Sequence, residues 1–163
     1  MSTPKGYTLT QILLHWAVFL LVALQFILHD GISEAWGRYM REGTFEPTAL
    51  VFGHVAGGIL ILLLVVWRMA IKARRGAPAL PEGEPPIMQL AANLTHLGLY
   101  ALLILMTVSG GMAWFGGQRW AAEGHEILKA LVLLLVALHV LGALYHQFVL
   151  KSDVMKRMGR PEA

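Results

Sequence analysis

The chain has 163 residues, of which 56% are hydrophobic and only 14% are charged. Soluble domains carry about 25% charged residues, so this composition argues against a soluble protein and favours one embedded in membrane lipid. The absence of cysteine excludes disulfides, thiolate metal sites, iron–sulfur clusters and haem attached through Cys-x-x-Cys-His. The net charge is +3, but the basic residues lie just outside apolar runs, as membrane anchors do. We therefore expect no nucleic-acid partner.

Four apolar segments follow one another, at roughly residues 10–28, 50–71, 90–115 and 125–150. Each is near or above the ~20 residues that a helix needs to cross a membrane. The first segment has no small-residue cleavage motif after it, so we interpret it as an uncleaved span rather than a signal peptide. The connectors are polar (30–49), basic and then proline-rich (72–86), and short (116–124). This pattern predicts one all-α transmembrane domain over residues 1–163.

The basic residues predict how the four spans are oriented. Nine of the thirteen Lys and Arg residues lie in the N-terminal tail, the second connector with its helix edge, or the C-terminal tail. The two segments on the opposite side hold the other four. By the positive-inside rule, both termini are then in the cytoplasm. We expect an antiparallel four-helix transmembrane bundle.

Histidine inside a spanning segment is costly in hydrocarbon and indicates a functional site. His125 and His139 lie fourteen residues apart on the last span, which puts them on one helix face about 21 Å apart along the axis. With the predicted orientation, His54 lies at the depth of His125 near the outer surface. His15 and His139 both lie in the cytoplasmic half. Axial haem ligands approach opposite faces of one flat ring, so matched depth predicts two haems, each held between facing helices.

Three further histidines are less easily assigned. His29 precedes Asp30 at a span end, and we interpret it as an interfacial polar residue. His96 and His146 lie in the cytoplasmic half, and depth excludes neither of them as a partner of His15. Each is either a hydrogen-bonded bundle histidine or part of a quinone or proton site. The sequence alone leaves the cytoplasmic pair open.

Other residues in the spans could serve a haem or simply the packing of the helices. Arg68 either snorkels to the headgroups or pairs with a haem propionate through its planar guanidinium, and we favour the propionate. Lys129, one turn after His125, is a candidate for the same role on the outer side. Gly57 and Gly58 follow His54, and small residues there either leave space for a porphyrin or let helices approach closely. Met106 and Met112 are interpreted as gap fillers.

At this point the sequence resembles the bacterial cytochrome b561 family of small di-haem cytochromes of the inner membrane. The resemblance covers almost the whole chain, and histidine order and spacing make it specific. The matching stretches are Ile12–Trp16 (ILLHW), His54–Ile59 (HVAGGI), Trp67–Arg68, His96–Tyr100 (HLGLY), His125–Glu126 and Leu138–Phe148 (LHVLGALYHQF), followed by a basic tail.

The resemblance implies two non-covalent, bis-histidine haem b groups. The positions of His15 and His139 then ligate the cytoplasmic haem iron, and those of His54 and His125 the periplasmic one. His96 and His146 are associated with the ubiquinone end. A branch of the family oxidises superoxide outside and reduces ubiquinone, so the implied activity is that of a superoxide:ubiquinone oxidoreductase in a bacterial inner membrane.

The charge of the outer segments departs from what an anionic donor would require. They carry four positive and six negative residues, a formal −2 with neutral histidines, whereas a surface that collects superoxide should be positive. Another one-electron donor therefore stays in consideration. A second hypothesis is a cytochrome b anchor subunit that passes electrons from a partner dehydrogenase or hydrogenase to quinone. A third is a non-redox role for the same histidines.

Overall fold

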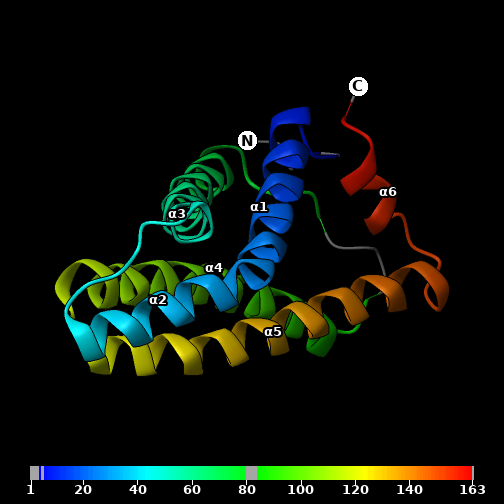
Figure 1. Cartoon of the computed structure of the whole chain (residues 1–163). Coiled ribbons are helices and arrows are strands. Elements are labelled where there is room, and N and C mark those ends of the chain that lie inside the picture. The colour runs from blue at the N-terminus through cyan, green and yellow to red at the C-terminus, as the bar shows by residue number, and fades with distance from the viewer. Residues whose placement is uncertain (1–3, 5, 80–83, 163) are drawn as a thin grey trace.

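A computed structural model of the protein describes residues 4, 6–79 and 84–162. Part of the proline-rich connector, residues 80–83, lies outside these described residues. Within the described part of the chain all the regular structure is helical, and Figure 1 shows its arrangement. The helices are α1 (Leu9–Ile27), α2 (His29–Glu42), α3 (Ala49–Arg75), α4 (Pro86–Gly116), α5 (Arg119–Phe148) and α6 (Val154–Gly159).

Four of these helices are long and apolar enough to cross a membrane. α1, α3, α4 and α5 contain 19, 27, 31 and 30 residues, with mean hydropathies of 1.9, 2.6, 1.7 and 2.5 in their most apolar windows. They expose many large apolar side chains, among them Phe52, Leu97 and Phe115. Apolar surface on this scale needs lipid or a partner to cover it. The predicted four spans and the membrane class are therefore confirmed, although α4 and α5 each begin several residues earlier than expected.

The starts of α1 and α3 are fixed by threonine caps. The Thr8 hydroxyl accepts a hydrogen bond from the Gln11 backbone N–H at 3.2 Å, and the Gln11 side chain accepts one from the Thr8 N–H at 3.0 Å. This reciprocal pair is a capping box, which satisfies two otherwise free donors. Thr48 caps α3 through the Val51 N–H at 3.3 Å. Lysine and arginine fill the last turn of α3, where cations interact favourably with the helix dipole.

The polar connector 30–49 differs from the expectation, because most of it forms helix α2. Its residues His29, Ile32, Ser33 and Trp36 line a common cavity. Their spacing of three, four and seven residues is that of one helix face. The helix ends at Gly43, whose φ of 72° is in the left-handed region that glycine adopts without strain. α2 therefore covers one end of the spans instead of looping away from it.

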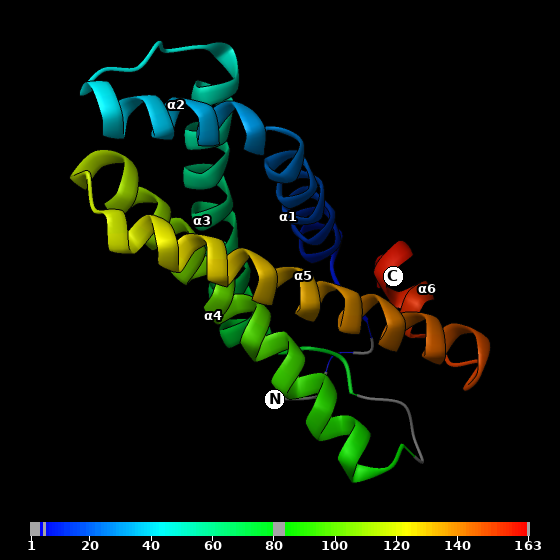
Figure 2. The same cartoon turned by 60° about the horizontal axis from the view of Figure 1, so that its bottom comes forward.

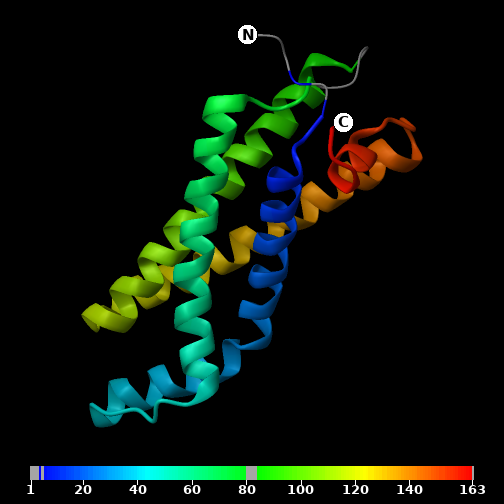
Figure 3. The ribbon, with the colours of Figure 1, turned by 90° about the horizontal axis from the view of Figure 1, so that it is seen from above.

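The spanning helices pack in chain order, α1 on α3, α3 on α4 and α4 on α5. Val18 of α1 and Ile61 and Val65 of α3 form the buried centre, with Tyr100 and Ile104 of α4 packed against it. Figures 1 and 3 show α1 and α3 alongside one another, with α4 and α5 crossing them obliquely.

α4 and α5 are joined by a two-residue connection, Gly117 and Gln118. Gly117 has a φ of 61°, again in the left-handed region. From this turn the two helices diverge toward the start of α4 and the end of α5 (Figure 2). The contacts between them are therefore closest near the turn and in the middle of the helices, where Gly98 lies against Leu135.

Segments far apart in the sequence meet at the end where α1 begins. The Glu162 N–H donates to the Tyr7 carbonyl at 2.9 Å, and Arg75 pairs with Glu162 at 2.6 Å. The Trp16 indole donates to the Met158 carbonyl at 3.1 Å, which joins α1 to α6. Asp153 directly precedes α6, and its carboxylate accepts a hydrogen bond from Arg157 that holds the pKa of Asp153 below the usual value.

The contact between α2 and α3 gives a test of this fold. A Cβ at Gly31 would lie 2.7 Å from the Cβ of Leu50, so Gly31→Ala forces the two helices apart. Overpacking of this kind costs about 1–3 kcal/mol, and we expect a lower thermal unfolding midpoint in detergent. Gly159→Ala is the control, because a Cβ there meets nothing within 4 Å. An unchanged midpoint for Gly31→Ala would contradict the packing of α2 on α3.

Candidate functional site

A cavity of about 440 Å³ lies among α1, α2, α3, α4 and α5 near the α4–α5 turn. Its lining is mostly apolar. The polar side chains in it include His29 of α2, His54 of α3 and His125 of α5. An apolar cavity of this size with a few convergent polar groups is typical of a cofactor or ligand site. The structure thus brings together the two histidines that depth had paired, and adds a third.

The His125 ring is oriented by α4. Its Nδ1 lies 2.9 Å from the Met106 carbonyl and 3.2 Å from the Ser109 hydroxyl. A carbonyl only accepts hydrogen bonds, so Nδ1 carries the proton and Nε2 keeps its lone pair. Metal-binding histidines are commonly held by such a second hydrogen bond. Met106 therefore contributes its backbone oxygen to this site.

Unpartnered polar atoms lie beside His54. The Nδ1 of His54 and the Nε2 and Oε1 of Gln25 are buried and have no hydrogen-bond partner among the described residues. Gln25 also lines the cavity. Buried polar groups are usually hydrogen-bonded, so these atoms fit a site that is completed by a bound group.

The glycines near His54 serve two different purposes. A Cβ at Gly57 would collide with the Gln25 amide, so Gly57 permits close packing of α1 on α3. Gly58 and Gly111 both line the cavity, and a Cβ at either would meet nothing within 4 Å. These two positions keep the walls of α3 and α4 flat, which suits a planar group such as a porphyrin.

A second group of histidines lies toward the other end of the spans. The ring centres of His15 (α1) and His139 (α5) are 6.1 Å apart, and those of His96 (α4) and His139 are 5.2 Å apart. All three side chains are partly buried. His139 therefore lies between two imidazoles from two different helices, and both alternatives for its partner are present in the structure.

His146 does not join this group. Its Nε2 lies 3.3 Å from the Glu84 carboxylate and its Nδ1 lies 3.2 Å from the Ser152 hydroxyl. The sequence predicts that His96 and His146 lie together at the quinone end, whereas His146 contacts residues just before α4 and just after α5. Glu84 and Ser152 lie outside the apolar runs, so their sequence positions do not mark them as intramembrane polar residues.

The two basic residues considered for haem propionates both have protein partners. Arg68 donates to the Gln11 carbonyl at 3.2 Å, in the first turn of α1 and one turn before His15. Lys129 forms an ion pair with Glu126, and its ammonium lies 3.0 Å from the Nε2 of His29. Lys129 lines the cavity with His125.

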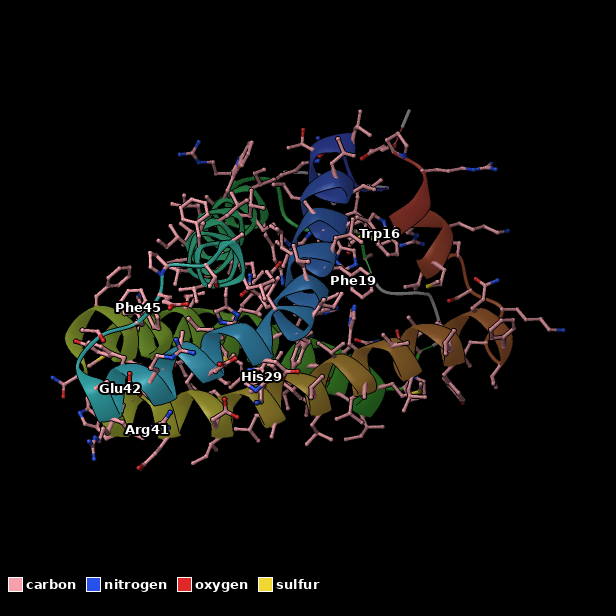
Figure 4. The ribbon with its side chains drawn as sticks, viewed as in Figure 1. Trp16, Phe19, His29, Arg41, Glu42 and Phe45 are labelled. Atoms are coloured by element: carbon pink, nitrogen blue, oxygen red, sulfur yellow. The ribbon has the colours of Figure 1, made fainter. Side chains whose placement is uncertain are left out.

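His29 was interpreted as an interfacial polar residue, yet it lines the cavity. It is the first residue of α2 and lies between this helix and α5 (Figure 4). Its partners are Lys129 and, at 3.4 Å, the Ser33 hydroxyl. The helical spacing of His29, Ile32, Ser33 and Trp36 was the signal in the sequence that could have revealed it.

Comparisons with known proteins identify the family. The sequence matches the family described as Prokaryotic cytochrome b561 over residues 6–161. The chain belongs to this family. It is 36% identical to Cytochrome b562 of Cereibacter sphaeroides over 162 residues, with 99% of each chain covered. It is 29% identical to Probable superoxide oxidase CybB of Yersinia pestis, with 94% of this chain and 96% of that protein covered.

A further relative is Cytochrome b561 homolog 1 of Escherichia coli, 25% identical with 93% of this chain and 96% of that protein covered. The resemblance drawn from the histidine motifs is thereby confirmed. This member of the b561 family is an integral membrane electron-transfer protein, and haem b is the cofactor that the family implies. The imidazoles, the flat glycine walls and the unpartnered polar atoms fit such a group.

The contact of Gly110 with His125 provides a test of the cavity. A Cβ at Gly110 would lie 3.0 Å from the Cε1 of His125, so Gly110→Val pushes the imidazole off the Met106 carbonyl. We expect a lower haem-to-protein ratio, measured from the Soret band of the purified protein. Gly116→Ala on the same helix is the control, because its Cβ would meet only the flexible Gln118 side chain at 3.4 Å. An unchanged ratio in Gly110→Val would contradict a haem site at His125.

Proposed function

We propose that the protein is a di-haem b-type electron carrier that oxidises superoxide at the periplasmic side and reduces ubiquinone. The observation that carries the proposal is the sorting of five intramembrane histidines into two groups at the two ends of the spans. A bundle with one redox site near each surface carries electrons across the hydrocarbon. Haem supplies the one-electron chemistry when bound, and the chain supplies ligands, orientation and exclusion of water.

At the outer site, His54 and His125 are the proposed ligands of the periplasmic haem iron. They come from α3 and α5 and line one cavity. The Met106 carbonyl holds the Nδ1 proton of His125, which leaves Nε2 free to bind iron. Lys129 lines the same cavity, and we assign it to a propionate on this side.

At the inner site, His15 and His139 are the proposed ligands of the cytoplasmic haem iron. If both imidazoles held one iron through metal–nitrogen bonds of about 2 Å, their ring centres would be roughly 6 Å apart. The separation of His15 and His139 is 6.1 Å, whereas that of His96 and His139 is shorter at 5.2 Å. This difference favours His15 and leaves His96 for another role. Arg68, one turn from His15, is the proposed propionate partner.

Contacts between distant segments support the proposed orientation in the membrane. The N-terminal segment, the end of α3 and the C-terminal segment meet through Tyr7, Arg75 and Glu162. These segments carry most of the basic residues, so the contacts support an antiparallel arrangement with both termini in the cytoplasm. We assign the protein to the bacterial inner membrane as a single transmembrane domain.

Superoxide is proposed as the electron donor. One named relative is a probable superoxide oxidase, and the cavity holds a cation, Lys129, beside His29. The formal charge of the outer segments is −2, so the attraction of an anion depends on this local pair rather than on the whole surface. Ubiquinone is the proposed acceptor at the inner end, with His96 and His146 as the residues nearest to it.

Alanine variants of the histidines test the ligand assignment. We expect His54→Ala and His125→Ala to lose the same haem, and His15→Ala and His139→Ala to lose the other, because each iron needs both of its imidazoles. Haem content and redox-titrated optical spectra of the purified variants measure this. His96→Ala is the control and keeps both haems. If His96→Ala or His146→Ala, rather than His139→Ala, shared its loss with His15→Ala, the inner assignment would be wrong.

The activity of the purified chain tests whether superoxide donates electrons directly or whether a partner subunit must deliver them. We expect the untagged protein alone to form ubiquinol when superoxide is generated enzymatically, and superoxide dismutase to abolish this reaction. The matched control is the same assay with the haem-depleted His54→Ala variant. Haem reduction only in the presence of a dehydrogenase or hydrogenase would instead favour the anchor-subunit function. A preparation made with adequate haem supply that lacks a Soret band would exclude both.

A further inference from the structure

Glu84 is a buried carboxylate at the membrane-proximal start of α4. Its side chain is 1% exposed, although it lies in the connector just before the helix. Neither carboxylate oxygen accepts a hydrogen bond from any residue that the structure describes. Its backbone carbonyl accepts a hydrogen bond from the Gln89 side chain at 2.9 Å. A buried carboxyl group without hydrogen bonds is costly in either protonation state, so its presence calls for a role.

Among the residues that the structure describes, His146 forms an ion-pair contact with this carboxylate. Its Nε2 lies 3.3 Å from a Glu84 oxygen, and its Nδ1 lies 3.2 Å from the Ser152 hydroxyl. Ser152 is in the turn between α5 and α6 and is partly exposed. Hydroxyl, imidazole and carboxylate therefore form a line from the surface turn to a buried acid. Each of these groups both gives and takes protons.

A purely structural role explains the contact less well. α4 and α5 diverge toward these ends (Figure 2), and the Glu84–His146 contact joins them there. A tether could be made by a neutral amide or by apolar packing without the cost of a buried carboxylate, since such replacements of buried ion pairs are often neutral or stabilising. Use of the proton itself would give the carboxyl group a role that an amide or an apolar side chain could not fill.

We infer that Ser152, His146 and Glu84 form a proton path that ends at Glu84, and that Glu84 protonates the reduced quinone. This inference rests on the proposed function and extends it. Two superoxide anions give two electrons, one at a time, and become two molecules of dioxygen. The quinone takes these two electrons and two protons from the cytoplasmic side and becomes quinol with two new O–H bonds. Each proton passes from water through Ser152 and His146 to Glu84, and then to a quinone oxygen.

Replacing the carboxyl group of Glu84 by an amide separates its role as a proton donor from a purely structural role as a tether between α4 and α5. Glu84→Gln keeps the size and one acceptor oxygen, but it replaces the other oxygen by an NH2 donor and carries no acid proton. We expect ubiquinol formation from superoxide and a short-chain ubiquinone to fall by about tenfold or more, because general acid–base groups contribute on that scale or above. The rate of haem reduction by superoxide, measured separately by rapid mixing, and the haem content stay unchanged. Glu84→Asp, which retains the acid, keeps most of the activity.

The matched control is Glu34→Gln, because Glu34 is an exposed carboxylate on α2 and its variant should form quinol at the wild-type rate. Should Glu84→Gln unfold, Glu84→Ala with added formate tests the same point, since a small acid in the vacated space restores quinol formation. Quinol formation within twofold of wild type in Glu84→Gln, or no response of Glu84→Ala to formate, overturns the inference alone. A wild-type protein whose haems are reduced by superoxide but which forms no quinol overturns the proposed function, and the inference with it.

Discussion

Polar side chains inside hydrocarbon need a polar partner, and this requirement governs how the helices of this protein are arranged. An imidazole among apolar helices loses its hydration, and the loss is offset only by a hydrogen bond, another polar group or a metal. His125 has the Met106 carbonyl, His139 lies between two imidazoles, and His146 lies against a carboxylate. His54 has a buried nitrogen with no partner among the described residues. The helices that carry these side chains must therefore face one another at matched depths.

This constraint explains how much of the site was predictable from the sequence. Apolar runs of about 20 residues predict spans, and positions along them give depth, so the pairing of His54 with His125 followed from counting residues. Depth could not choose between His15, His96 and His146 as neighbours of His139, because that choice depends on how helices are rotated and crossed. The structure places both His15 and His96 beside His139, and only the separation of the rings distinguishes them.

What the sequence did not reveal lies mostly outside the spans. The segment of α2 was interpreted as a polar connector because its composition is polar, and the structure shows that His29 and Trp36 face the cavity. Glu84 follows a proline-rich stretch, and nothing in its neighbours indicates burial. Its environment arises from the way α4 and α5 diverge, which is a property of packing between helices and not of either helix alone.

The hydrogen bond between Glu162 and Tyr7 also has a consequence for the order in which the helices can be connected. Because these two residues are adjacent, a short linker between the end of α6 and the start of α1 would bridge them without disturbing any helix. New chain ends could then be placed in the exposed connector 43–48 between α2 and α3, where circular permutation is best tolerated. A permuted protein would begin with α3 and end with α2, while all the histidines keep their neighbours. The helix order in the sequence is therefore only one of the orders that this arrangement of helices permits.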